Sequence, residues 1–145
     1  MANLTMTRAE REAFLAETRV GILTVDEPAR GPCTTPLWYQ YSPGAPIRIT
    51  LSPTSRRVQL LRKTGRASLC VQQESLPYKY VVVEGPIELL EVNVEDDQRE
   101  IACRYLGGDL GERYLAANAE VLSHEILLLL RPVHWRSVDF SKLRL

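Results

Sequence analysis

Alternating and continuous runs of apolar residues predict a mainly β protein. In residues 47–51, the apolar side chains of Ile47, Ile49 and Leu51 alternate with polar ones, so this strand is expected to bury one face. Residues 80–90 are rich in β-branched side chains, which favour a long strand over a helix. Further strands are expected at residues 20–25, 34–41, 67–72, 124–130 and 133–138. The strand at 34–41 contains Pro36, which has no N–H for a ladder, so it is expected at an edge or with a bulge.

Helix start and stop signals predict three or four short helices. Thr7 and Glu10 have the spacing of a capping box, which begins a helix over residues 7–17. Ser55 is a candidate cap for a second helix over 55–63, which ends at Gly65 and buries its apolar face. That face consists of Val58, Leu60 and Leu61.

A third helix is expected from residue 95, because the acidic run 95–97 suits a helix N-terminus. Ile101, Ala102 and Tyr105 would form its inner side. The glycines at 107, 108 and 111 are expected to break the chain before a short helix over 112–119. Strands outnumber helices and do not alternate with them, so we expect one domain, residues 1–145, built as an antiparallel β-barrel with peripheral helices.

Composition supports a globular protein and excludes several classes. The 145 residues are 45% hydrophobic and 25% charged, which excludes disordered and collagen-like chains. No apolar run approaches the length of a membrane span. The segment 1–8 becomes charged too early for a signal peptide. The three cysteines form no CxxC pair, so a disulfide framework is not expected and a cytoplasmic location is.

Charge is segregated along the chain although the formal net charge is zero. Residues 28–73 contain seven Lys and Arg and no acid, whereas residues 84–125 contain eleven acids and three arginines. Either the cations await an anionic ligand, or the acidic segment packs against them. Nucleic-acid binding is not expected, because the cations are coupled to hydroxyls at one helix start and are not interleaved with stacking aromatics.

Familiar catalytic motifs are absent from the sequence. It has no GxxxxGK[ST], GxGxxG or GxSxG, and His124 and His134 have no clustered ligands, so no metal site is expected. One segment stands out. Residues 50–57 leave a strand and enter a helix with hydroxyls at Thr50, Ser52, Thr54 and Ser55, followed by two arginines. Such a helix start can bind phosphate through its free N–H groups and its arginines, or it can be a capped helix with surface arginines.

The chain resembles the FMN-binding split-barrel superfamily that includes pyridoxamine 5′-phosphate oxidase, and especially its small actinobacterial F420-dependent members. The resemblance covers nearly the whole chain. It rests on motifs in a characteristic order: Val20-Gly21-Ile22-Leu23, Thr35-Pro36-Leu37-Trp38-Tyr39, Ser55-Arg56-Arg57-Val58, Tyr78-Lys79-Tyr80-Val81 and Arg104-Tyr105-Leu106-Gly107. It implies a split β-barrel of six or seven strands, with F420, or alternatively FMN, as the cofactor.

The same resemblance implies roles for individual residues. Ser55, Arg56 and Arg57 would hold the cofactor phosphate, and Thr50 and Ser52 would line the same pocket. Pro36, Leu37 and Trp38 would lie along the ring. Because family members pair as homodimers with the cofactor across the interface, Tyr78 and Lys79 of the other protomer would complete the site.

The function implied is that of an F420-dependent oxidoreductase, which transfers a hydride from the reduced deazaflavin to a small conjugated acceptor. The alternatives are a non-catalytic protein that binds F420, FMN or haem, and an FMN-dependent oxidase. Pyridoxamine phosphate oxidation itself is not expected, because the family's true oxidases carry a longer C-terminal region. Arg48, Arg62, Lys63 and Arg66 extend the positive charge, which favours the polyanionic F420 over FMN. No catalytic acid or base is evident.

Overall fold

A computed structural model describes residues 3–144, so the first two residues of the 1–8 segment and Leu145 lie outside it. Seven antiparallel strands form one curled sheet in the order β2-β1-β4-β5-β6-β3, with β7 paired to β5. The strands are β1 (Gly21–Val25), β2 (Cys33–Leu37), β3 (Ile47–Leu51), β4 (Arg66–Gln73), β5 (Lys79–Glu91), β6 (Ile126–Leu130) and β7 (His134–Asp139). A bridge from Gln40 to Arg48 joins the chain after β2 to β3. The predicted mainly β architecture is confirmed.

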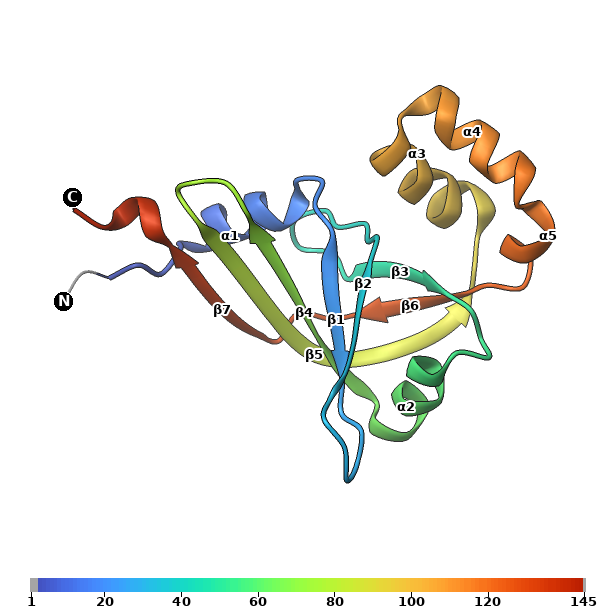
Figure 1. The fold of residues 1–145 in the computed structure, drawn as a ribbon, viewed down its shortest axis with the longest axis horizontal. Helices are drawn as coiled ribbons and strands as arrows, with labels where there is room; N and C mark the ends of the chain where they lie inside the picture. Colours follow the sequence, from blue (N-terminus) through green and yellow to red (C-terminus); the bar gives the residue numbers. More distant parts are fainter. Residues whose placement is uncertain (1–2, 145) are drawn as a thin grey trace.

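The long strand β5 connects the two halves of the barrel (Figure 1). Residues 79–86 pair with β4, residues 79–84 also pair with β7, and residues 87–91 pair with β6. Gly85 lies at the change of partner, where a Cβ atom would overlap the carbonyl oxygen of Arg131. Only glycine therefore permits this close backbone approach.

Two helices flank the barrel and follow the predicted signals. In α1 (Arg8–Ala16), Thr7 and Glu10 form the predicted capping box, with bonds of 3.2 and 3.1 Å. The helix α2 (Arg56–Thr64) ends at Gly65, whose φ of 68° is left-handed. Its inner residues Val58, Leu60 and Leu61 are buried, as predicted.

A helical cap, which we define as residues 94–122, lies beside the β3 and β6 end of the barrel (Figure 1). It comprises the π-helical turn η1 (Val94–Arg99), α3 (Glu100–Leu106), α4 (Gly108–Ala117) and α5 (Ala119–Leu122). After β7 a short 3-10 turn, η2 (Phe140–Lys142), follows at the opposite end of the molecule. The longest of these helices has ten residues, and none in residues 3–144 is long and apolar enough to cross a membrane.

The predicted glycine-rich break at residues 107–111 is wrong in its extent. Only Gly107, with φ of 81°, interrupts the chain, and α4 already begins at Gly108. Gly111 lies inside α4. A Cβ at this position would come within 2.8 Å of the Cys103 sulfur, so a larger residue would not fit. This glycine therefore permits close packing of α3 on α4 and does not form a turn.

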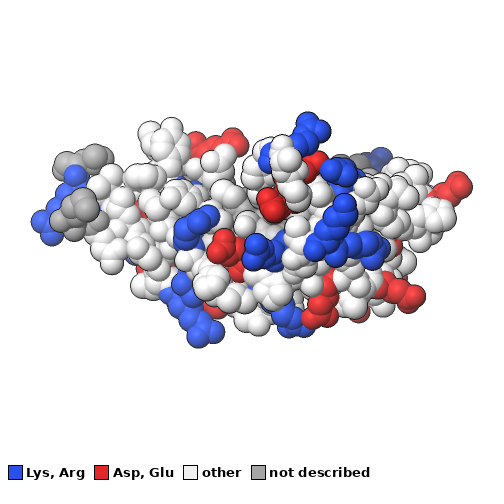
Figure 2. Space-filling model, turned by 90° about the horizontal axis from the view of Figure 1, so that it is seen from below, with Lys and Arg blue, Asp and Glu red and all other residues white. Residues whose placement is uncertain are grey.

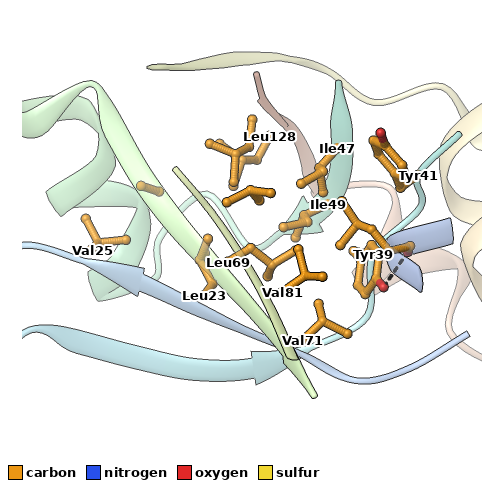
Figure 3. Packing of buried hydrophobic residues seen from close by; sticks show 14 of the residues in the cluster. Leu23, Val25, Tyr39, Tyr41, Ile47, Ile49, Leu69, Val71, Val81 and Leu128 are labelled. Atoms are coloured by element: carbon orange, nitrogen blue, oxygen red, sulfur yellow. Dashed lines mark hydrogen bonds between the residues drawn. The ribbon is translucent and has the colours of Figure 1, made fainter. Parts of the chain in front are cut away.

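The barrel interior contains one large apolar cluster, which includes Leu23, Ile49, Leu69 and Leu128 (Figure 3). The alternation predicted for residues 47–51 is confirmed, since the three apolar side chains are at most 1% exposed. The edge position predicted for Pro36 is also confirmed, because β2 pairs only with β1 among the strands of residues 3–144. However, β2 ends at Leu37, earlier than predicted, because the N–H of Tyr39 donates to the Tyr105 hydroxyl of the cap (3.0 Å).

Candidate functional site

The turn from β3 into α2 places the predicted phosphate-binding segment at the surface. Ser55 occupies the N-cap position, but its hydroxyl donates to the carbonyl oxygen of Ser52 (2.8 Å). The side-chain cap expected from Ser55 is therefore not formed. The first-turn N–H groups of α2 consequently have no side-chain cap, and such groups attract anions.

Arg56 has an intramolecular partner that the sequence analysis did not predict. Its Nε and Nη2 donate to a carboxylate oxygen of Glu27, at 3.0 and 2.6 Å. Glu27 follows β1 and is only 9% exposed, whereas the Arg56 side chain is 58% exposed. The guanidinium of Arg56 therefore holds a buried carboxylate as well as lying beside the helix start.

Arg57 differs from its neighbour. It is half-buried, and its Nε is shielded from solvent without a hydrogen-bond partner among residues 3–144. A buried donor without a partner is costly, and an incoming acceptor would relieve that cost. Of the two arginines, Arg57 is thus the one with a buried donor that has no partner among residues 3–144.

Trp38 and Thr50 meet beneath the helical cap. The Trp38 ring stacks on Tyr105, with centroids 5.0 Å apart and planes 6° from parallel, and lies 5.9 Å from the ring of Tyr114. A small pocket beside them has a volume of about 20 Å³. It is lined by Trp38, Thr50, Gln98, Ile101, Ala102, Tyr114, Leu122 and Glu125. That space suits a single water, so a flavin-sized ring does not fit inside it.

Glu125 completes the lining of this pocket. Its carboxylate accepts a hydrogen bond of 3.0 Å from the Gln98 amide. Burial raises the pKa of the Glu125 carboxyl, although hydrogen bonding from Gln98 and Thr50 and the positive charge of Arg57 lower it. Sequence analysis missed both Glu125 and Glu27, because neither belongs to a motif and both act across long sequence separations.

The acidic segment does pack against part of the basic one. Arg48 on β3 donates through Nε to Asp97 in the cap (2.7 Å), and its Nη2 contacts the same oxygen. Asp97 is 1% exposed. Of the two interpretations of the charge pattern, internal pairing therefore holds for Arg48. Figure 2, seen from the side of α2, still shows Lys and Arg gathered near this helix, with acids between them.

The remaining predicted residues are distributed over two regions. Leu37 is half-buried against the barrel core, and Pro36 and Ser52 are exposed. Tyr78 and Lys79 lie at the opposite end of the barrel from α2, since Lys79 pairs with Gln73 at the far end of β4. Eight residues of strand span about 25 Å. One chain therefore does not bring Tyr78 and Lys79 to the helix start, and the Lys79 ammonium lies 3.8 Å from Asp139 instead.

A larger open pocket of about 740 Å³ lies on the outer face of the sheet; none of the predicted site residues lines it, but Arg66, one of the cations expected to extend the positive charge, does. Thr24, Ser68, Glu84 and His134 are successive cross-strand neighbours on β1, β4, β5 and β7, and all four line it. Within residues 3–144, no group of three or more His, Cys, Asp or Glu could hold a metal ion. The three cysteines are free and half-buried.

Comparison with solved structures shows the fold. A conserved hypothetical protein from Mycobacterium tuberculosis is 22% identical, with a TM-score of 0.78, 98% of this chain and 90% of that chain covered. An F420 reductase is 17% identical, with a TM-score of 0.61, 86% of this chain and 94% of that chain covered. A FAD-binding protein from Mesorhizobium loti is 20% identical, with a TM-score of 0.64, 92% of this chain and 93% of that chain covered.

These likenesses show the fold: the chain shares the split β-barrel of these structures. The fold implied by the motifs in the sequence is thereby confirmed. No family model matches the chain, and no curated protein does.

Proposed function

We propose that the protein is an F420-dependent oxidoreductase that reduces a small conjugated acceptor. The observation that carries the proposal is the start of α2, where uncapped N–H groups lie beside the unpartnered Nε of Arg57. Both features suit the phosphate of a flavin or deazaflavin. The likeness of the fold to an F420 reductase and a FAD-binding protein supports a cofactor of this kind.

The residues present fit the phosphate end of such a cofactor. Ser55, Arg57 and the first-turn N–H groups would hold the phosphate, and Ser52 and Thr50 lie on the preceding turn and strand. Pro36 and Leu37 of β2 would lie along the ring, which the 20 Å³ pocket is too small to hold. When bound, reduced F420 supplies the hydride, and the role of this chain is to bind and orient.

We further propose that two chains pair, because Tyr78 and Lys79 reach the helix start only from a second copy. An apolar row supports a pairing surface on the outer face of the sheet. Pro36, Ile22, Cys70 and Val82 are cross-strand neighbours there, and each is half-buried or exposed. Sedimentation should give twice the 16.4 kDa chain mass. Val82→Asp should shift the protein to the monomer, and a monomeric parent protein would contradict the proposal.

Direct titration with F420 and with FMN tests the cofactor. Arg57→Ala should weaken binding by about 1.5–3 kcal/mol, the scale of a hydrogen bond to a charged group, or roughly 10–150-fold in Kd. Arg113→Ala is the matched control, because Arg113 is an exposed arginine on α4, outside the basic segment 28–73. Equal affinities for both variants and the parent protein would reject this site.

The same titrations decide between the two cofactors. We expect F420 to bind more tightly than FMN, with an affinity that falls as salt screens the exposed cations near α2. Tighter binding of FMN at low and at high salt would instead make the chain a flavin protein. Binding of F420 without turnover of any unsaturated acceptor would favour a storage or delivery role.

A further inference from the structure

A second pocket, with a volume of about 160 Å³, lies between α1, the segment that joins β2 to β3, and the start of β7. None of the residues assigned above to cofactor binding lines it. The side chains on which its chemistry depends are Arg8, Arg11, Glu12, Tyr41 and Trp135. They combine two cations, one acid and two aromatic rings, so the pocket is neither a plain apolar gap nor a purely charged one.

Two aromatic side chains form the apolar wall of this pocket. The rings of Tyr41 and Trp135 meet edge to face, with centroids 6.4 Å apart. Tyr41 is 3% exposed and lies at one edge of the barrel's apolar cluster (Figure 3), and Trp135 packs against the same cluster. Both rings are therefore held in place by the core. A space of roughly 150 Å³ is sufficient for a benzene-sized molecule, so the pocket has room for one planar ring.

Arg11 of α1 lies over this wall. Its guanidinium carbon is 4.6 Å from the centroid of the Trp135 ring, which is a cation–π contact. Its Nε is shielded from solvent and has no hydrogen-bond partner among residues 3–144. Stacking occupies the face of a guanidinium, whereas its N–H donors lie in the plane and suit a planar oxyanion. An acceptor at this edge would satisfy a donor that is costly to leave unpaired.

The charges around the pocket leave one positive charge in excess. Arg8 and Glu12, one turn apart on α1, form an ion pair of 3.3 Å. Glu12 is the one acid among the described residues that line the pocket, and its charge is already matched by Arg8. Arg11 therefore remains for a ligand with a single negative charge. A second negative charge on the ligand would meet Glu12 and be unfavourable.

We propose that this pocket binds small aromatic monocarboxylates. The carboxylate would accept two parallel hydrogen bonds from the edge of the Arg11 guanidinium, the arrangement that the fork geometry of arginine favours. The ring would lie against Trp135 and Tyr41, where its apolar surface is removed from water. The inference goes beyond the proposed function and does not depend on it, because the two sites share no residue.

Titration of the parent protein with benzoate, followed through the indole N–H signals in NMR spectra, tests the proposal. The chain has two tryptophans, so Trp38→Phe assigns both signals. Benzoate should shift the Trp135 signal and leave the Trp38 signal in place. Benzamide keeps the ring without the charge, and acetate keeps the charge without the ring. Each should bind at least about tenfold more weakly than benzoate, since a hydrogen bond to a charged group or the burial of a ring is lost.

Substitution of Arg11 tests the role of the guanidinium. Arg11→Met keeps an extended side chain against Trp135 but removes the donors and the charge, so benzoate should bind at least about tenfold more weakly. Arg113→Met, at an exposed position of α4, is the matched control and should leave the affinity unchanged. Circular dichroism checks that each variant is folded. The comparison of benzoate with benzamide uses the parent protein, so it decides the question even if Arg11→Met does not fold.

Several results would overturn the proposal. Equal affinities for benzoate and benzamide would show that the charge is not recognised, and an unchanged affinity in Arg11→Met would show that another group binds the carboxylate. A shift of the Trp38 signal alone would place benzoate at the candidate cofactor site. No shift of either signal at millimolar benzoate would reject the pocket, while the cofactor titrations would be unaffected.

Discussion

The barrel core and the core of the helical cap differ in size and in the contacts that surround them. The barrel buries a cluster of twenty apolar side chains, whereas the cap buries Ala102, Leu115 and Leu122 with help from Tyr114. The cap compensates with directional bonds to the barrel. Asp97 contacts Arg48, and the Tyr105 hydroxyl donates to the Arg19 carbonyl oxygen at 2.6 Å.

The difference shows how position is specified in each region. Apolar burial is non-directional and tolerates exchange of residues of similar volume, so it stabilises the barrel without fixing any one contact. Hydrogen bonds and ion pairs fix distance and orientation. The cap covers Trp38, Thr50 and Glu125, and its placement decides the shape of the candidate site. We therefore expect the two regions to respond differently to substitution.

The largest effect is expected at the barrel's change of strand partner. Gly85→Ala forces a Cβ into the carbonyl oxygen of Arg131, which is backbone and cannot turn away. The free energy of unfolding should fall by more than about 3 kcal/mol, beyond the usual range for overpacking. Gly31→Ala is the control, since a Cβ there meets no atom within 4 Å. Chemical denaturation measures both, and equal stability would contradict the role of Gly85.

Truncation of one leucine in each region compares the two cores directly. Leu128→Ala removes a fully buried side chain from the barrel and should cost about 3–4 kcal/mol. Leu115→Ala in the cap, where the side chain is 8% exposed and the cluster is small, should cost about 1–2 kcal/mol. Hydrogen exchange should show faster exchange throughout the barrel for the first variant and only within residues 94–122 for the second. Uniform loss of protection in both would mean that the cap and barrel unfold as one unit.

Weakening the ion pair between the cap and the barrel is expected to have a smaller effect on the free energy of unfolding. Asp97→Asn weakens the bonds to Arg48 and leaves that guanidinium without its carboxylate. Because Arg48 is one-third exposed and water can solvate it, the cost should be about 1–2 kcal/mol, below that of a fully buried pair. Trp38 fluorescence in a Trp135→Phe background reports whether the cap has moved. An unchanged spectrum with unchanged stability would show that the ion pair does not hold the cap.

Proton binding at Glu125 is expected to have the smallest effect on the free energy of unfolding. Since the folded state raises the pKa of this carboxyl, the folded protein binds the proton more tightly than the unfolded chain does. The free energy of unfolding should therefore decrease as pH rises from about 4.5 through the raised value. The total is expected to be under about 1 kcal/mol, because the half-exposed carboxylate is screened by solvent. Glu125→Gln should abolish this component, and a pH dependence identical to the parent protein would assign it to another group.

The sequence was most informative where local pattern determines structure. The alternation in residues 47–51 predicted the inner face of β3, and the Thr7–Glu10 spacing predicted the start of α1. Contacts between distant segments could not be predicted in this way. Glu27 and Arg56 are 29 residues apart, and Arg48 and Asp97 are 49 apart.

The candidate site shows the same division. The hydroxyls and arginines of residues 50–57 were visible as a motif, but their partners were not. The prediction for Gly111 was wrong because the sequence does not distinguish a glycine required for close helix packing from a glycine required for a turn. Glu125 gave no signal at all, because its half-buried position and its hydrogen bond from Gln98 arise only when the chain folds.

The pairing of Glu91 with Ile126 has a consequence for how this chain can be rebuilt. These two residues are adjacent across the sheet, so the segment 92–125 begins and ends at neighbouring positions. Residues 92–125 are in effect an insertion into a β-hairpin, and a short turn of two to five residues would satisfy the same strand ends. The helical cap can thus be exchanged for another segment without altering the strand order of the barrel. Exchange of the helical cap would change which side chains lie against Trp38 and Thr50, while the start of α2 would stay unchanged.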